Sequence, residues 1–525
     1  MEKLASYLAG TWEEGTGPRF VLENPATETP LAEGRAVASA APAFAWARNV
    51  GIENVTALGY RERAERLEAL SKRMFEERER FLDLAVANGG NTRKDAKFDV
   101  DGASAVLAAY ARIGADLPEG NVRPVDAAVP LLKTGKLRAQ QVFVPRRGVA
   151  VQVNAFNFPA WGMVGKFAVA FLAGMPTIAK PATSTCLLAY HIARVFLESG
   201  LLPDGALQLY LGPAGDLLDH VDGQDVIAFT GSADTGRKIR TGARVLDAGT
   251  RVNVEADSLN AAVVAADVEP GTELYDTLLR DLVTEMTQKA GQKCTAFRRI
   301  LVPEPLADRL QEDLVDRLGA VAERTGDPAR DEVRMGPLSS AAQLRDARAG
   351  LARLSEATER VFGDPERTSF VGVPDGKGHF LEPILLRATS DAALDGAAPF
   401  HHCEVFGPVA TLLPYDGTLE AAARIVALGG GSLQSSLYTN DRDLAARAIE
   451  HLGAYLGRMV IDDEKNAAGS IPPGGVLPLV HHGGPGRAGD GSELGGTTGL
   501  ALYQQRLSLQ AGASLLAKTV PGAAS

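Results

Sequence analysis

The chain has few cysteines and no long hydrophobic run. Its three cysteines, Cys186, Cys294 and Cys403, include no CxxC pair, which excludes a disulfide framework. The most apolar stretch, residues 164–173, contains Lys166 and is too short to span a bilayer. The start, MEKLASYLAGTWEEG, has an acidic second residue and no apolar core, so it does not resemble a signal peptide. We therefore expect a soluble, cytoplasmic protein with no membrane partner.

An excess of positive charge is also lacking. The 525 residues include 65 Asp and Glu against 54 Lys and Arg, which gives a formal net charge of −11. A protein that neutralises phosphates along a nucleic acid is expected to be basic, so we predict no nucleic-acid partner. Hydrophobic residues make up 45% of the chain and charged residues 23%, as in an ordinary globular protein of up to roughly three domains.

Residues 149–268 contain a regular succession of short apolar runs and helical segments. The clearest helical segment, residues 184–198, is followed by Gly200. Buried strands that alternate with helices predict βαβ units and a parallel sheet. The expected strands are residues 149–153, 177–179, 206–211, 226–229, 252–254 and 261–265. The predicted fold class is therefore α/β.

Helical periodicity is present on both sides of this region. The expected helices are residues 61–84, 99–112, 274–290, 306–323 and 340–359, and a further strand is expected at 299–302. Residues 467–496 are rich in glycine and proline but include Leu477, Leu479 and Val480. This composition favours an ordered loop that approaches a ligand or another chain over a flexible linker.

Three residues are candidates for nucleophilic and acid–base chemistry. Cys294 follows a helical segment in a polar, glycine-containing sequence, where a thiol can act as a nucleophile. Glu255 ends an apolar strand, the place where α/β enzymes put groups that face a ligand. Asn157 follows the strand at 149–153, and its amide can donate to an oxyanion. Each also has an ordinary structural explanation: a core cysteine, a solvated strand end and a turn-capping asparagine.

Two strand-to-helix turns could bind phosphate groups. Residues 230–236, Thr-Gly-Ser-Ala-Asp-Thr-Gly, follow one strand, and Ser232 is suited to cap the next helix, whose free amides attract anions. This turn is neither a GxGxxG nor a Walker A sequence, so alone it is a moderate signal. Lys180-Pro181-Ala182 follows another strand, and its lysine could reach a nucleotide, although most lysines are simply solvated.

In combination and in order, these segments resemble the aldehyde dehydrogenase family over nearly the whole chain. The shared segments are Asn157-Phe158-Pro159, Lys180-Pro181-Ala182, Gly231-Ser232-Ala233-Asp234-Thr235-Gly236, Glu255, Gly291-Gln292-Lys293-Cys294 and Glu404-Val405-Phe406-Gly407-Pro408. The resemblance implies the fold of that family, with a Rossmann-like NAD(P)-binding domain, an α/β catalytic domain and a small β oligomerisation arm. The domain bounds that it implies are 1–125 and 146–266, 267–480, and 126–145 with 497–525, respectively.

The resemblance also implies a homodimer or a dimer of dimers. Alternating residues in LRAQQVFVP and ALYQQRLSLQ, in the two segments of the arm, fit two strands. Because an isolated two-stranded arm is only marginally stable in water, we expect these strands to pair across subunits.

The reaction implied by the resemblance is the oxidation of an aldehyde. Cys294 would attack the carbonyl to give a thiohemiacetal, and Asn157 with the Cys294 amide would hold the oxyanion. A nicotinamide cofactor would receive the hydride, and Glu255 would activate the water that hydrolyses the resulting thioester. The residues expected to bind the cofactor are Lys180, Ala182, Thr183, Ser184, Gly231, Ser232, Gly236, Glu404 and Phe406.

One departure from the family pattern bears on the cofactor. Thr183 stands where the common form has a glutamate that binds the hydroxyls of the adenosine ribose. A carboxylate repels a 2′-phosphate, whereas a hydroxyl can donate a hydrogen bond to it. We therefore expect NADP to be the preferred cofactor and NAD to be a weaker one.

Three segments resemble a narrower group, the semialdehyde dehydrogenases of aerobic aromatic degradation through CoA thioesters. These segments are residues 255–260, 288–294 and 482–489. One branch serves benzoate degradation and acts on 3,4-dehydroadipyl-CoA semialdehyde, and the other serves phenylacetate degradation and is fused to a hydratase domain. Because this chain ends at Ser525, soon after the dehydrogenase pattern, we expect the CoA-linked substrate of the benzoate branch.

Other functions have less support from the residues. A phenylacetate-pathway semialdehyde and a general aliphatic aldehyde remain alternative substrates. An acylating dehydrogenase, in which free CoA resolves the thioester, usually lacks a base such as Glu255. A catalytically silent binding protein has no need of the set Cys294, Glu255 and Asn157. His481 and His482 lack further ligands at metal-binding spacing, so we predict no metal and expect them to line the substrate entrance or cap a loop.

Overall fold

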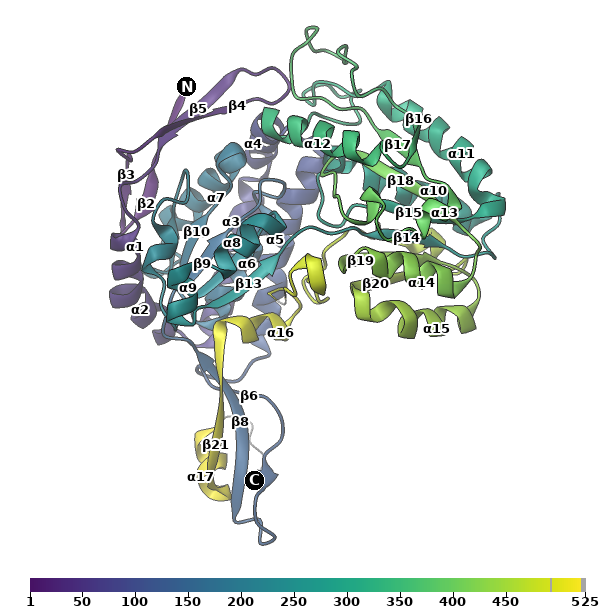
Figure 1. Ribbon diagram of the computed structural model, residues 1–525. Helices are drawn as coiled ribbons and strands as arrows, with labels where there is room; N and C mark the ends of the chain where they lie inside the picture. Colours follow the sequence, from purple (N-terminus) through teal and green to yellow (C-terminus); the bar gives the residue numbers. More distant parts are fainter. Residues whose placement is uncertain (492, 521–525) are drawn as a thin grey trace.

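The computed structural model describes residues 1–491 and 493–520. Two large α/β units lie side by side, and a narrow arm projects from the first (Figure 1). Each unit is built on a seven-stranded, mostly parallel sheet. The alternation of strands and helices in the sequence predicts this α/β class, which the structure confirms. Within the described ranges, no helix has the length and apolarity needed to cross a membrane.

The first sheet has the strand order β13-β12-β9-β10-β11-β2-β3. Its strands are β2 (Ser6–Leu8), β3 (Thr11–Glu13), β9 (Ala150–Val153), β10 (Thr177–Lys180), β11 (Leu207–Leu209), β12 (Val226–Thr230) and β13 (Arg251–Glu255). Strands β9 to β13 are parallel, and β10 and β12 flank β9 on opposite sides. The crevice outside the carboxyl ends of β9 and β12 is therefore a topological switch point, where sheets of this kind bind ligands.

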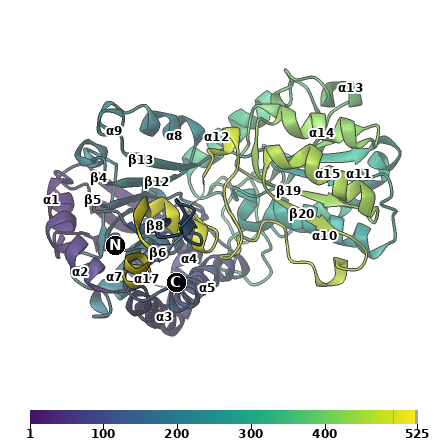
Figure 2. The same cartoon turned by 90° about the horizontal axis from the view of Figure 1, so that it is seen from below.

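Helices cover both faces of this sheet (Figure 2). They are α1 (Ala41–Trp46), α2 (Ile52–Ala57), α3 (Tyr60–Glu76), α4 (Arg78–Gly89), α5 (Arg93–Ala115), α6 (Trp161–Ala173), α7 (Cys186–Glu198), α8 (Ala233–Arg240) and α9 (Ala243–Ala248). Ala150 packs into the core on the α3–α7 side, and Val151 packs into the core on the α8–α9 side. Successive residues of one buried strand thus fill both layers. The single helix predicted over 61–84 is two helices, because the chain turns at Glu77.

The second sheet has the order β16-β17-β18-β15-β14-β19-β20. Its strands are β14 (Ala261–Val264), β15 (Arg299–Pro303), β16 (Glu359–Phe362), β17 (Ile384–Arg387), β18 (Val409–Tyr415), β19 (Ser432–Tyr438) and β20 (Leu456–Asp462). The predicted boundary at residue 266 is wrong for β14, which pairs with β15 and β19. A short apolar run shows that a strand is buried, but it does not show which of two sheets the strand joins.

Helices also cover the second sheet, in two separate cores. They are α10 (Glu273–Thr287) and α11 (Glu304–Ala322) on one face, and α12 (Ala341–Leu354), α14 (Leu419–Leu428) and α15 (Arg442–Leu452) on the other. The short α13 (Ser390–Ala393) follows β17. The helix predicted over 340–359 ends at Leu354, and β16 begins at Glu359.

The arm is a small antiparallel sheet. Its strands are β6 (Arg123–Pro124), β7 (Val129–Pro130), β8 (Leu137–Pro145) and β21 (Gln504–Gly512), with α16 (Thr497–Leu500) before it and α17 (Ala513–Thr519) packed on it. The two nine-residue strands β8 and β21 pair with each other within one chain, and the short strands β6 and β7 pair with β8. Because β21 lies at the edge of this sheet, the expected pairing across subunits stays a prediction. Residues 521–525 of the predicted arm lie outside the described residues.

A three-stranded sheet at the N-terminus and a C-terminal loop complete the structure. The sheet is β1 (Glu2–Leu4), β5 (Pro30–Arg35) and β4 (Arg19–Glu23). The glycine- and proline-rich segment predicted at 467–496 passes between the two units (Figure 1). The amide of Ala256 donates to the carbonyl of Ala488, and Arg240 donates to the carbonyl of Gly489. The loop therefore packs against the end of β13.

Candidate active site

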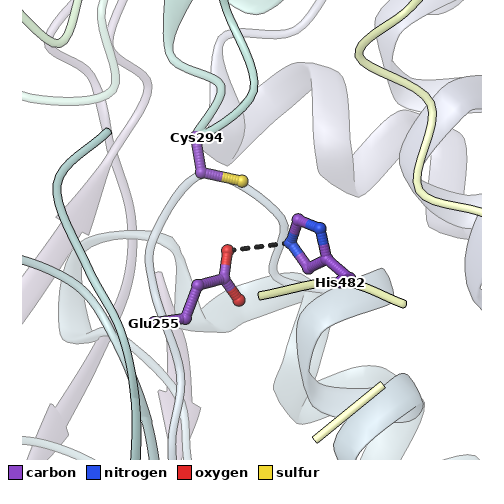
Figure 3. Close-up of side chains that lie close together, drawn as sticks. All are labelled: Glu255, Cys294 and His482. Atoms are coloured by element: carbon purple, nitrogen blue, oxygen red, sulfur yellow. Dashed lines mark hydrogen bonds and ion pairs between the residues drawn. The ribbon is translucent and has the colours of Figure 1, made fainter. Parts of the chain in front are cut away.

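Glu255, Cys294 and His482 lie together where the two units and the C-terminal loop meet (Figure 3). Glu255 is the last residue of β13, Cys294 follows the 3₁₀ turn η4 (Gln288–Gly291), and His482 comes from the loop. Nε2 of His482 is 3.0 Å from Oε1 of Glu255. One potential ligand atom from each side chain lies within 4.8 Å of the other two.

The turn before Cys294 has an unusual backbone. Lys289, Ala290 and Gly291 have φ values of 54°, 52° and 68°, so three consecutive residues are left-handed. A left-handed conformation costs about 1–2 kcal/mol for each residue that has a Cβ. A Cβ at position 291 would lie 2.2 Å from the carbonyl oxygen of Gly407, so glycine is needed there for space as well. The surrounding structure must hold this turn in place.

Side chains on both sides fix the Cys294 backbone. Nδ2 of Asn260 donates to the carbonyls of Cys294, at 2.8 Å, and Ala296, at 2.9 Å. The neighbouring Lys293 is fully buried, and its Nζ is 2.8 Å from Oε2 of Glu285. The charge of Lys293 is thus neutralised by Glu285, and the thiol gains no activation from it.

Protonation states in the site are complementary. Burial raises the pKa of the Cys294 thiol well above 9.0, and the charge of Glu255 raises it further. Burial also raises the pKa of Glu255, but the charge and hydrogen bond of His482, together with the charge of Lys166, outweigh it and lower that pKa to about 2. At neutral pH, therefore, a protonated thiol lies beside an ionised carboxylate.

Asn157 lies where the sequence predicts, after the carboxyl end of β9. Its side chain is buried, and Nδ2 donates to the carbonyl of Gln292 at 3.0 Å. A side-chain amide has two N–H groups, so one remains for a further acceptor. Asn157 lines both cavities that reach Cys294. This arrangement suits a donor to an oxyanion that forms on a carbonyl held by Cys294.

A cavity of about 500 Å³ extends from Cys294 to the switch point of the first sheet. Five of the predicted cofactor residues line it, along with Asn157, Glu255 and Cys294: Ala182, Gly231, Ser232, Glu404 and Phe406. The side chain of Ser232 caps α8 by accepting a hydrogen bond from the amide of Thr235. The amino end of α8 therefore faces this cavity, as the sequence predicts.

The remaining predicted cofactor residues do not line this cavity: Lys180, Thr183, Ser184 and Gly236. Lys180 is buried at the end of β10, and its Nζ donates to the carbonyl of Pro181. Thr183 and Ser184 belong to the 3₁₀ turn η2 (Thr183–Thr185), directly after Ala182. A Cβ on Gly236 would lie 2.8 Å from Cγ1 of Val254, so this glycine allows α8 to pack on β13.

Glu404 and Phe406 form part of the far wall of the same cavity. Glu404 accepts hydrogen bonds from the amide of Ser258 at 3.1 Å and from Nε of Arg298 at 3.2 Å. Burial nevertheless raises the pKa of Glu404 to about 7. The ring of Phe406 meets that of Phe156 edge to face, with centroids 5.7 Å apart. The Glu-Val-Phe-Gly-Pro segment thus faces the Asn157 segment across the cavity.

A second, narrower cavity of about 70 Å³ lies on the other side of Cys294. Its aromatic wall consists of Phe98, Phe158 and Trp161. Its polar wall includes Lys166 and His482, and it shares Glu255, Asn157 and Cys294 with the larger cavity. The thiol therefore lies at the junction of a wide polar cavity and a narrow, largely aromatic one.

Some residues of this site were missed by the sequence reasoning. Nζ of Lys166 is 2.7 Å from Oε2 of Glu493, and both side chains are buried. His482 contacts Glu255 across 227 positions of sequence, so no spacing indicates the pair. The sequence predicts no metal, yet the structure gathers a carboxylate, a thiol and an imidazole, types that can bind zinc. The hydrogen bond between His482 and Glu255 accounts for their approach.

The fold and the site together define a class of protein. A thiol, an adjacent carboxylate and a side-chain amide lie between a large cavity at a sheet switch point and a second, narrower cavity. These are the types of group that an enzyme with a covalent intermediate needs. The chain belongs to the aldehyde dehydrogenase family, because the sequence model of that family matches residues 12–488.

Individual relatives agree with this assignment. The chain is 40% identical over 487 residues to a 3,4-dehydroadipyl-CoA semialdehyde dehydrogenase of Aromatoleum evansii, which covers 92% of this chain and 93% of the relative. It is 27% identical over 475 residues to an alpha-ketoglutaric semialdehyde dehydrogenase of Bacillus subtilis, and the match covers 86% of this chain and 89% of that relative. A solved structure of betaine aldehyde dehydrogenase from Staphylococcus aureus in complex with NAD⁺ matches this fold with a TM-score of 0.82 at 22% identity. The match covers 97% of this chain and 95% of that structure's chain. The last likeness shows the fold.

Proposed function

We propose that this protein oxidises a CoA-linked semialdehyde, 3,4-dehydroadipyl-CoA semialdehyde, to the carboxylic acid, with NADP as its preferred cofactor, in benzoate degradation. The observation that carries the proposed chemistry is the position of Cys294, beside Glu255 and Asn157 and between two cavities. The proposed substrate is supported by the 40% identical relative, which carries that name and matches this chain over 92% of its length.

The larger cavity fits a nicotinamide dinucleotide. Ser232 and the amino end of α8 would hold the pyrophosphate, because the free amides at a helix start attract anions. Glu404 would accept from the hydroxyls of the nicotinamide ribose, and Phe406 would pack beside the nicotinamide. Thr183, next to Ala182 on the cavity wall, would donate to a 2′-phosphate that a carboxylate at this position would repel. The bound cofactor supplies the acceptor for a hydride.

The first half of the reaction forms a bond between Cys294 and the substrate. Sγ attacks the aldehyde carbon while its proton passes to the carboxylate of Glu255, which is ionised at neutral pH. The free N–H of the Asn157 amide and the backbone N–H of Cys294 donate to the oxyanion of the thiohemiacetal. Such donors are worth about 3 kcal/mol each in related chemistry. Loss of the hydride from this carbon leaves a thioester on Sγ.

The second half of the reaction releases the acid. After Glu255 has returned its proton to solvent, its carboxylate takes a proton from a water that attacks the thioester carbonyl. The carbon–sulfur bond breaks, and the Cys294 thiolate is protonated again. His482 holds the Glu255 carboxylate through its 3.0 Å contact and so acts as a positioning residue for this base.

We further propose that the first unit is the cofactor-binding domain, that the second unit is the catalytic domain, and that the chain forms a homodimer. The first unit carries most of the residues assigned to the cofactor, and the second unit supplies Cys294 and Glu404. The arm supports the dimer because it projects from the first unit with β21 at its edge, and Leu507 on that strand is exposed (Figure 1).

Initial rates with NADP and NAD, measured in parallel with the CoA-linked semialdehyde and with hexanal, test this proposal. We expect kcat/KM to be higher with NADP than with NAD. We also expect it to be higher for the CoA-linked aldehyde than for hexanal. Equal rates on hexanal with NAD would leave the family chemistry of Cys294 in place and contradict the proposed substrate and cofactor.

A further inference from the structure

A separate cavity of about 490 Å³ lies between the two units. Its walls are the amino end of α5, the carboxyl end of α10, and the end of α11 with the loop that follows it. Five cationic side chains line it: Arg93, Lys94, Arg324, Arg330 and Arg334. The two carboxylates that line it are Asp95, which is buried, and Asp331, which is exposed.

Most of this positive charge is not neutralised by the protein. Arg93 is paired with Asp83 at 2.9 Å and with Glu79, and Arg330 lies 3.6 Å from Glu332. The side chains of Lys94, Arg324 and Arg334 make no hydrogen bond or ion pair with any residue that the structure describes. Like charges gathered around one cavity repel one another, so the arrangement favours an anionic occupant.

The basic cavity adjoins the narrow cavity beside Cys294. Lys94 and Phe98 lie four residues apart on α5, and hence on the same face and about 6 Å apart along its axis. Lys94 lines the basic cavity, and Phe98 lines the narrow one. Gln288 also lines the basic cavity, and Nζ of the next residue, Lys289, lies 4.4 Å from the centre of the Phe158 ring, which lines the narrow cavity. One turn of helix therefore separates the two cavities.

We propose that the basic cavity binds the phosphorylated nucleotide end of CoA while the aldehyde end of the same substrate reaches Cys294. This inference rests on the proposed function. CoA ends in an adenosine with a diphosphate and a 3′-phosphate, and arginine side chains recognise phosphate oxygens with paired hydrogen bonds. The long pantetheine arm of CoA connects these phosphates to the acyl chain, which matches a phosphate site beside a narrow cavity.

Calorimetric titration of CoA into the protein, with the cofactor site filled by NADPH, tests this assignment. NADPH prevents the adenosine of CoA from occupying the cofactor cavity. We expect the wild type to bind CoA, 3′-dephospho-CoA to bind more weakly, and Arg324→Glu/Arg334→Glu to lower the affinity for CoA at least about tenfold, because two favourable contacts become repulsive. The affinity of the wild type should fall as ionic strength rises.

The matched control is Arg442→Glu/Arg447→Glu, which reverses two exposed arginines on α15, away from this cavity. We expect it to bind CoA like the wild type. Arg324→Gln/Arg334→Gln removes the charges without reversing them and should lie between the wild type and the reversed variant. Thermal unfolding of each variant shows that the changes leave the protein folded.

Two results would overturn the assignment: no binding of CoA by the wild type, or equal binding by the wild type and Arg324→Glu/Arg334→Glu. Oxidation of the CoA-linked semialdehyde by the wild type is measured separately. Efficient oxidation combined with either of those results would leave the proposed function in place and remove this cavity from it. Loss of CoA binding in the charge-reversed variant, without oxidation of that substrate by the wild type, would retain the phosphate site and contradict the proposed function.

Discussion

The two cavities that meet at Cys294 are built in different ways. The larger one, of about 500 Å³, is bounded by the amino end of α8 and the carboxylate of Glu404. The narrower one, of about 70 Å³, is bounded by aromatic rings and by buried, paired groups such as Lys166 and His482. A wide polar site suits a charged dinucleotide, and a narrow aromatic one suits an alkyl chain with a reactive end. The difference supports the proposed placement of the cofactor in the larger cavity and of the aldehyde in the narrower one, because both cavities reach Cys294.

The largest expected effect comes from the residue that the two cavities share. Cys294→Ala removes the nucleophile, so kcat/KM for the aldehyde should fall on the order of 10⁴-fold or more. The larger cavity keeps its walls, so the affinity for NADPH, measured by fluorescence, should stay unchanged. Cys403→Ala is the matched control, because this thiol lines neither cavity and should not be needed. Full activity of Cys294→Ala would contradict the covalent mechanism.

A smaller loss is expected from the base that faces both cavities. Glu255→Gln removes the carboxylate that activates water, so steady-state turnover should fall about 10²- to 10⁴-fold. Acylation can still proceed through the fraction of thiol that is ionised, and this fraction grows as the pH rises. Rapid-mixing absorbance at pH 9 should show one burst of reduced cofactor followed by a stall. Steady-state turnover at the wild-type rate would reject Glu255 as the deacylating base.

An effect confined to the narrow cavity is expected from His482→Asn. In the wild type, His482 lowers the pKa of Glu255 to about 2, against an ordinary value of 4.5. Without it, burial raises this pKa, so Glu255 becomes protonated at a higher pH and activity is lost earlier as the pH falls. The acid limb of the pH profile of kcat should therefore move to higher pH, so that kcat at low pH falls relative to the wild type.

The adjacent His481 supplies the control for this change. It is exposed, whereas His482 is buried against Glu255. His481→Asn should therefore keep the pH profile of the wild type. Identical profiles for both histidine variants would show that His482 does not position or charge the base.

The smallest expected effect lies at the far end of the larger cavity. Thr183→Glu places a carboxylate beside the expected 2′-phosphate site, so the ratio of kcat/KM for NADP to that for NAD should fall about tenfold. Reactivity of Cys294 with iodoacetamide should stay unchanged, because the narrow cavity is untouched. An unchanged cofactor ratio would remove Thr183 from the cofactor site.

Local sequence predicts the larger cavity well because its walls follow strand ends. Asn157 follows β9, Ser232 follows β12, and Glu255 ends β13. The carboxyl ends of neighbouring parallel strands meet at one edge of a sheet, so residues distant in sequence are brought together by a rule that the sequence itself reveals. Lys180, Thr183, Ser184 and Gly236 are exceptions, because none of them lines this cavity, and Gly236 instead allows α8 to pack on Val254.

The narrow cavity could not be predicted in the same way. His482 and Phe98 reach it from a loop and from a helix whose docking depends on tertiary packing, and Lys166 in its wall is paired with the loop residue Glu493. The sequence places β14 in the first unit, whereas it pairs with β15 and β19 of the second sheet. The reason is related, because a short apolar run does not show which of two sheets a strand joins.

The most direct test of the account is intact-mass and peptide-mass analysis of Glu255→Gln after mixing with NADP and the CoA-linked semialdehyde at pH 9. We expect one added acyl group per chain, retained as a thioester on Cys294 and released by hydroxylamine, with one equivalent of NADPH formed. NADPH formation without an acyl group on Cys294, or an acyl group on another residue, would contradict the central role of Cys294 between the two cavities.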